Sequence, residues 1–207
     1  MTILFPEVLL LTCNSDFADQ YPDANVIGTD LSPMQPTWTP QNMKFEIDDA
    51  TLPWTWDENR FGFIHMRYLM GSIRDYGALF KQAFAHTKPG GLIESVEIDS
   101  DFRSDDGTVD GVPALQKWNE LFREAGKATG AVFSVIADDL QRKGLAAAGY
   151  VDIEAKTFKV GLLHQLNGRI LVVWRMAALT LTGSYGWLGA RPYPRGDWSH
   201  HQRCARQ

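Results

Sequence analysis

The sequence has 207 residues, with 20 Lys and Arg against 25 Asp and Glu and a formal charge of −5. This length allows one globular domain with its own core, and the acidic balance excludes the basic surface that nucleic-acid binding requires. No run of residues approaches the roughly 20 apolar positions of a membrane span. Cys13 and Cys204 are too few for a disulfide framework or a thiolate zinc site, so a reducing compartment, cytoplasmic or nuclear, is expected.

The first third of the chain alternates short apolar runs with turn signals. A buried strand is expected at Glu7 to Leu11, and a short helix fragment at Asp16 to Tyr21. The next strand, which is expected to begin at Asn25, ends before the Ser32-Pro33 and Gln35-Pro36 pairs, because these pairs are turn signals. Three further strands are expected at Asn25 to Thr29, Met43 to Ile47 and Phe61 to Met66.

The helical period begins after Asp75 and continues until Lys88 to Gly91, which is a turn that ends the helix. A strand is expected at Leu92 to Ile98, directly after the turn. A second helix begins at Pro113, a residue that favours the first helical position. The last expected elements are a helix capped by Asp138 or Asp139 that ends at Gly149, and a strand at Tyr150 to Phe158.

This order of elements predicts an α/β fold in which helices cover both faces of a parallel sheet. We expect one domain over residues 1–182, followed by an irregular or disordered tail over residues 183–207 that shows no helical or strand period. His200, His201 and Cys204 in this tail have no fourth ligand at a matching spacing, so no metal site is expected.

Four blocks of sequence between residues 16 and 97 carry a resemblance to a known family. They resemble class I S-adenosylmethionine-dependent methyltransferases, specifically the fungal LaeA-like group of secondary-metabolism regulators. Each block alone is a weak signal, whereas the four in the same order are specific. The blocks are Asp16 to Pro22 with Val26 to Pro33, Phe45 to Ala50 with Trp54 to Trp56, Phe61 to Arg67, and Lys88 to Glu94.

The resemblance implies a three-layer Rossmann-like sheet, incomplete at both ends, and S-adenosylmethionine as cofactor. Asp30, at the end of the second family strand, would accept the ribose hydroxyl protons; its alternative is a turn residue that caps Ser32. The family pattern places Asp49 on the adenine amino group and the Ala50 backbone beside the ring, whereas a solvated loop is the other reading. His65 would contact the cofactor or orient a substrate, or it is a structural histidine beside the Phe63 ring.

Arg67 is open to two interpretations as well. It lies beside the predicted cleft, at the end of a family strand, where a direct part in the reaction is conceivable. The alternative is a structural ion pair with Glu94 or Glu97, both in the next strand.

The sequence departs from the family where a glycine-rich turn should follow the first strand. Val8 to Ser15 occupies that place, and no glycine precedes Gly28. Such a turn brings backbone N–H groups to the methionine end of the cofactor. Losing one or two charge-assisted hydrogen bonds costs roughly 1.5 to 3 kcal/mol each. Two such losses amount to about 3 to 6 kcal/mol, or two to four decades in affinity. If an intact site binds at roughly micromolar strength, we therefore expect weak binding of S-adenosylmethionine here, with a dissociation constant of about 0.1 to 10 mM.

Three functions are compared. The first is methyl transfer to a small-molecule or protein acceptor, in which the protein holds methyl donor and acceptor in line and needs no fixed nucleophile or base. The second is a regulatory or interaction protein without turnover, which acts through a regulatory protein partner; the missing turn favours it. The third, a nicotinamide-dependent dehydrogenase, lacks its own glycine fingerprint. The resemblance places acceptor pockets in residues 100–135 and 160–180.

Overall fold

The computed structural model describes residues 1–6, 11–33, 38–105, 107, 109–161 and 173–182. Seven strands form one sheet in the order β3-β2-β1-β4-β5-β7-β6. Strands β1 to β5 pair in parallel, and β7 runs antiparallel to both of its neighbours. The elements are β1 (Thr2–Pro6), α1 (Leu11–Gln20), β2 (Asn25–Asp30), β3 (Met43–Ile47), β4 (Phe61–Arg67), α2 (Tyr76–His86), β5 (Thr87–Ile98), α3 (Pro113–Thr129), α4 (Leu140–Ala148), β6 (Val151–Gly161) and β7 (Val173–Thr182).

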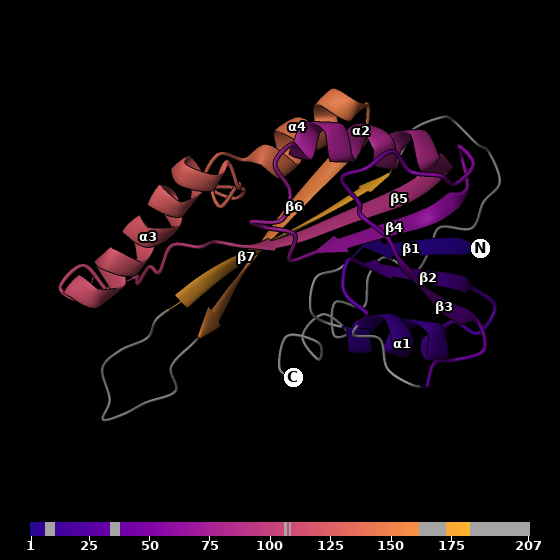
Figure 1. Ribbon diagram of the computed structural model, residues 1–207, viewed down its shortest axis with the longest axis horizontal. Coiled ribbons are helices and arrows are strands. Elements are labelled where there is room, and N and C mark those ends of the chain that lie inside the picture. Colours follow the sequence, from indigo (N-terminus) through magenta and orange to yellow (C-terminus); the bar gives the residue numbers. More distant parts are fainter. Residues whose placement is uncertain (7–10, 34–37, 106, 108, 162–172, 183–207) are drawn as a thin grey trace.

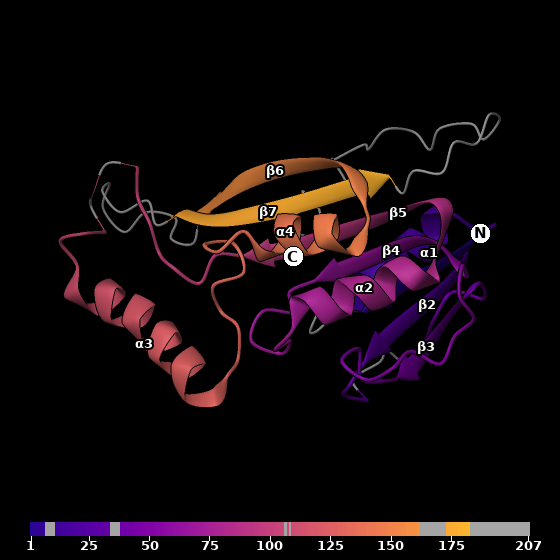
Figure 2. The ribbon, with the colours of Figure 1, turned by 90° about the horizontal axis from the view of Figure 1, so that it is seen from above.

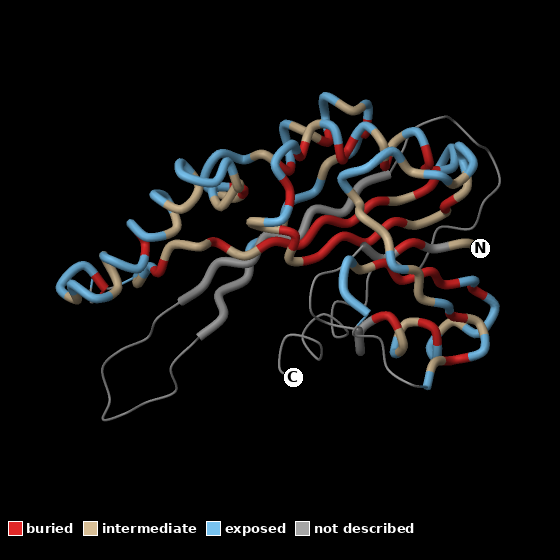
Figure 3. The backbone as a smooth tube through the Cα atoms, viewed as in Figure 1, coloured by how far each residue is buried: buried red, intermediate tan, exposed pale blue. Residues whose placement is uncertain are grey.

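Helices cover both faces of the sheet, which confirms the predicted three-layer α/β fold. Helices α2 and α4 lie on one face and α1 lies on the other (Figure 1). Between α2 and the sheet, Phe80, Ile27 and Ile64 are fully buried in the larger core. A smaller core under α1 contains Ala18 and Val26. Figure 3 shows the buried residues concentrated along the central strands.

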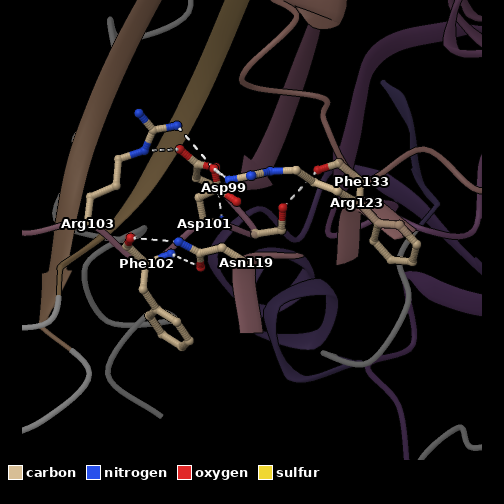
Figure 4. A network of polar contacts seen from close by, with 8 residues as sticks. Asp99, Asp101, Phe102, Arg103, Asn119, Arg123 and Phe133 are labelled. Carbon is tan, nitrogen blue, oxygen red and sulfur yellow. Dashed lines mark hydrogen bonds and ion pairs between the residues drawn. The ribbon is translucent and has the colours of Figure 1, made fainter. Parts of the chain in front are cut away.

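Helix α3 extends beyond the sheet (Figure 2) and is fixed to the segment after β5. The buried Asn119 side chain bonds the Phe102 backbone twice, accepting its N–H at 2.9 Å and donating to its carbonyl at 3.2 Å. The Arg123 guanidinium lies 3.0 Å from the Asp101 carboxylate (Figure 4). This network and α3 both belong to residues 100–135, one of the two ranges in which the family resemblance implies acceptor pockets.

The beginning of the chain differs from the sequence-based prediction. The first strand is β1, which ends at Pro6, and Leu11 is already the first residue of α1. Residues 7–10 of the strand predicted at Glu7 to Leu11 lie outside the described residues, and Leu11, the last residue of that range, begins α1 instead. The true strand is short, and it is held by parallel pairing on both sides, with Leu4 opposite Ile27 and Ile64.

Other boundaries match or move by a few residues. The strands β2, β3 and β4 agree with the predicted ranges to within one residue. Strand β5 begins at Thr87, so Lys88 to Gly91 belongs to the strand, although the helix does end just before it. Asp139 occupies the N-cap position of α4, but at φ 54° its side chain makes no capping bond. Strand β7 was not predicted, and the tail at residues 183–207 lies outside the described residues.

Candidate functional site

The candidate site lies at the carboxyl ends of the parallel strands, the edge where open α/β sheets bind ligands. The strand register shows which residues reach this edge. Leu4 lies level with Ile27 in β2 and with Ile64 in β4. His65 is therefore level with position 28, two residues before Asp30. The sheet brings Asp30 and His65 to the same half of the molecule, as predicted.

Asp30 ends β2 and is half-buried. Its Oδ1 accepts the backbone N–H of Ser32 at 2.8 Å, which is the turn contact of the alternative interpretation. Within the described part of the chain, no donor contacts the other carboxylate oxygen, so the turn role leaves Oδ2 able to accept a hydroxyl proton. The Asp30 carbonyl also accepts the Asp48 N–H at 3.1 Å. This bond joins the end of β2 to the segment after β3.

Asp49 and Ala50 form a tight turn directly after that bond. The Asp49 N–H donates to Asp48 Oδ1 at 2.8 Å. Asp49 Oδ1 accepts both the N–H and the hydroxyl of Thr51, at 2.8 and 2.7 Å. Among the residues that the structure describes, the Ala50 N–H has no acceptor and Asp49 Oδ2 has no donor. The turn thus has one carboxylate oxygen and one N–H, on neighbouring residues, that no described group binds.

His65 is enclosed within the sheet layer. Its Nδ1 lies 2.7 Å from Glu94 Oε2, and the two side chains are only 6% and 5% exposed. Its ring centroid is 6.2 Å from that of Phe63. A carboxylate at this distance fixes the orientation of the ring. This geometry favours the structural interpretation, and a contact of His65 with a cofactor stays a prediction.

Arg67 is buried at the end of β4, and its Nη2 donates to the Tyr68 hydroxyl at 3.2 Å. The guanidinium carbon also lies 4.5 Å above the Tyr68 ring. Glu97, one of the two ion-pair partners considered for it, uses both carboxylate oxygens elsewhere. A direct part of Arg67 in the reaction remains untested.

Glu97 is fully buried near the end of β5, and sequence reasoning missed its role. Its carboxylate accepts the N–H groups of Leu69 and Met70 at 3.1 and 3.2 Å and the Tyr76 hydroxyl at 3.0 Å. Burial raises the pKa of Glu97 to about 7. Burial and the nearby Glu97 carboxylate raise the pKa of Tyr76 far above its usual range. The available signal was a charged residue between Val96 and Ile98, in a predicted buried strand.

Glu97 holds the loop between β4 and α2 at the same sheet edge. Tyr68 begins this loop in the left-handed region, at φ 54°, and donates its N–H to the Val96 carbonyl at 3.0 Å. A buried carboxylate that binds two successive N–H groups constrains such a loop strongly. Buried acids with a raised pKa near a ligand-binding edge are enriched at functional sites.

A small hollow opens beside the Asp49–Ala50 turn. Its lining comes from Leu4, Thr29, Asp48, Ala50, Trp54 and Trp56. The space enclosed there is too narrow for a water molecule, so the hollow is a shallow depression and not a ligand pocket, which usually measures about 300–1,000 Å³. Residues 7–10, which connect β1 to α1 and contain no glycine, lie outside the described residues.

The described ranges contain neither a membrane-spanning helix nor a cluster of metal ligands. None of the helices there has the length and apolar character to cross a membrane. In the same ranges, no group of three or more His, Cys, Asp or Glu side chains is arranged to hold a metal ion. His200, His201 and Cys204 lie outside them.

The sheet order and the acidic turns at its carboxyl edge define a Rossmann-like domain of the methyltransferase type. A family model described as a methyltransferase domain matches residues 11–154. The chain belongs to this methyltransferase family.

Curated relatives narrow the group. The secondary metabolism regulator LAE1 of Cochliobolus heterostrophus is 35% identical over 164 residues, which is 76% of this chain and 53% of LAE1. The protein-methionine methyltransferase laeA of Emericella nidulans is 34% identical over 160 residues, 77% of this chain and 40% of that protein. The chain thus spans about half the length of these relatives or less, and the match confirms the resemblance to the LaeA-like group.

Solved structures agree on the fold. Phosphoethanolamine N-methyltransferase 2 of Haemonchus contortus, in complex with S-adenosyl-L-methionine, superposes with a TM-score of 0.62 at 11% identity, covering 89% of this chain and 49% of that one. The YcgJ protein of Bacillus subtilis gives a TM-score of 0.57 at 12% identity, covering 89% and 92%. At these identities the likeness confirms the Rossmann-like methyltransferase architecture.

Proposed function

We propose that residues 1–182 form the methyltransferase domain of a LaeA-like regulator and bind the adenosine half of S-adenosylmethionine at the carboxyl edge. One observation carries the proposal. The Asp30 carbonyl binds the Asp48 N–H at 3.1 Å, so the acidic end of β2 and the Asp49–Ala50 turn form one continuous surface. Among the described residues, one carboxylate oxygen of Asp30, one of Asp49 and the N–H of Ala50 are left without a partner.

These groups match the chemistry of adenosine. The Asp30 carboxylate accepts the ribose hydroxyls, and charge-assisted hydrogen bonds of this kind are about twice as strong as neutral ones. The Asp49 carboxylate accepts the adenine amino group, while the Ala50 N–H donates to the ring. When bound, the cofactor supplies an electrophilic methyl group on sulfur. The chain's part is to hold donor and acceptor in line, a positioning role that needs no side-chain nucleophile or base.

Methyl transfer to a small-molecule or protein acceptor and regulation without turnover are both consistent with this binding. Methyl transfer is the main proposal, which the match to the methyltransferase family supports. The lack of glycine before Gly28 is the observation behind the alternative, regulation without turnover. Secondary-metabolism regulators among the relatives support a regulatory protein partner. The cytoplasm or the nucleus is the proposed place of action.

The test is a titration of the purified chain with S-adenosylmethionine, followed by NMR. Asp30→Ala and Asp49→Asn should each weaken binding about tenfold or more, since each removes hydrogen bonds to a charged group. Asp23→Asn is the control, because Asp23 is exposed in the turn before β2, at the opposite edge of the sheet. Equal affinities for wild type, Asp30→Ala and Asp49→Asn would refute the site.

A further inference from the structure

Two tryptophans between β3 and β4 form an aromatic cluster next to the hollow. The Trp54 and Trp56 ring centroids are 5.6 Å apart in an edge-to-face arrangement. Trp56 makes a second edge-to-face contact, at 5.3 Å, with the fully buried ring of Phe61. Both tryptophans also line the hollow beside Ala50. The segment after the Asp49–Ala50 turn is thus seated on the core by its indole rings.

Helix α2 holds this segment in place through polar contacts. Gln82 Oε1 accepts the Trp54 backbone N–H at 2.9 Å. The buried His86 ring has Nε2 3.1 Å from the Trp56 carbonyl and Nδ1 2.7 Å from the Gln82 carbonyl. The His86 ring also packs on Trp54, with 5.2 Å between the ring centroids. The final turns of α2 therefore fix the backbone at both tryptophans.

Trp54 passes this restraint on to the candidate site. Its indole Nε1–H donates to the Ala50 carbonyl at 3.1 Å. In the part of the chain that the structure describes, the Ala50 N–H has no acceptor and one carboxylate oxygen of Asp49 has no donor. That carbonyl belongs to the Ala50–Thr51 peptide, whose N–H donates to Asp49 Oδ1 at 2.8 Å. The indole bond therefore orients the peptide that holds the Asp49 carboxylate in the turn.

Building on the proposed function, we propose that Trp54 is a positioning residue that makes the Asp49–Ala50 turn selective for adenine. Adenine has a donor, its 6-amino group, next to an acceptor, N1. The turn offers the complementary pair, the acceptor of Asp49 next to the donor of Ala50. Hypoxanthine, the base of inosine, reverses both groups, with an acceptor at O6 and a donor at N1. A turn held in one orientation distinguishes these two patterns, and a loose turn does not.

The test compares adenosine with inosine as NMR-titrated ligands of the full chain. Trp54→Phe keeps an aromatic ring in the cluster and removes only the indole donor to Ala50. We expect the dissociation constant of adenosine to rise about three- to tenfold, the loss of one hydrogen bond, while that of inosine stays the same. The preference for adenosine therefore falls by that factor.

Two further variants make the result interpretable. Gln82→Met removes the acceptor of the Trp54 backbone N–H and leaves every aromatic ring in place. It should also lower the preference for adenosine over inosine. Trp118→Phe is the matched control, because Trp118 lies on α3 and contacts Phe102 and Phe122, remote in sequence from the turn. It should leave both dissociation constants unchanged.

The outcomes separate this inference from the proposed function. If the wild type binds neither adenosine nor S-adenosylmethionine, the proposed function fails. If the wild type prefers adenosine and Trp54→Phe keeps the full preference, the positioning role fails and the proposed function stands. If Trp54→Phe weakens both nucleosides equally, Trp54 supports the fold only, and the inference is again overturned.

Discussion

The buried Glu97 gives the chain a pH-dependent stability that can be calculated from the structure. Burial raises its pKa from 4.5 to about 7, so the folded state holds this proton more tightly than the unfolded chain does. The neutral carboxyl therefore contributes stability that is fully present below pH 4.5 and is lost as the pH rises through 7. A rise of this size corresponds to about 3 kcal/mol.

Glu97→Gln removes this titration and keeps the shape of the side chain. An amide stays neutral at every pH, so the variant retains the stability that the wild type loses. The difference in unfolding free energy between variant and wild type should grow in the variant's favour by about 3 kcal/mol between pH 4.5 and 7.5. Other carboxyl groups titrate equally in both proteins and cancel in this comparison.

Urea denaturation, followed by tryptophan fluorescence at several pH values, measures the difference. Glu58→Gln is the control, because Glu58 is exposed between β3 and β4 and its charge stays in water in both states. A difference for Glu97→Gln that is independent of pH, or that grows toward acid, would refute the reasoning.

Three other predictions concern single residues and the cofactor. Asn14 is 1% exposed and its Oδ1 has no hydrogen-bond partner among the described residues, so Asn14→Ala should stabilise the chain by about 1 kcal/mol, and a lowered thermal midpoint would contradict this. Asp75 caps α2 by accepting the Ala78 N–H at 2.9 Å. Asp75→Ala should lower the free energy of unfolding, measured by urea denaturation, by about 1 kcal/mol; an unchanged value would show that the cap does not stabilise the helix. Calorimetry should give a dissociation constant of about 0.1 to 10 mM for S-adenosylmethionine, and a value at or below about 10 μM would mean that other residues replace the glycine-rich turn.

Much of the fold followed from the sequence because the central strands carry strong local signals. Strand β3 was located from its own residues, and α2 from the apolar period after Asp75. Strand β1 was not predicted, because the apolar run Leu9 to Leu11 drew the prediction of the first strand to Glu7 to Leu11, of which only Leu11 is described, as the first residue of α1. Strand β7 was missed because it pairs antiparallel between β5 and β6, and the family resemblance had marked that region as variable.

The candidate site was predictable only where it is local in sequence. Asp30 and the Asp49–Ala50 turn were proposed from family blocks. The structure joins their segments through the bond from the Asp48 N–H to the Asp30 carbonyl, and their part in binding stays a prediction. The contacts that support them join residues far apart along the chain, such as Trp54 with Gln82 and Leu69 with Glu97. No periodicity or spacing reports such contacts, because they arise only when the sheet and α2 pack together.

The central claim is that this methyltransferase domain holds the adenosine half of S-adenosylmethionine, with no assigned contact for the methionine half. Saturation-transfer difference NMR tests it most directly, because it reports which ligand protons lie against the protein. The account predicts strong transfer to the adenine and ribose protons of S-adenosylmethionine, weak transfer to its methionine protons, and loss of both in Asp30→Ala. Equal or stronger transfer to the methionine protons, or none to the adenine ring, would contradict it.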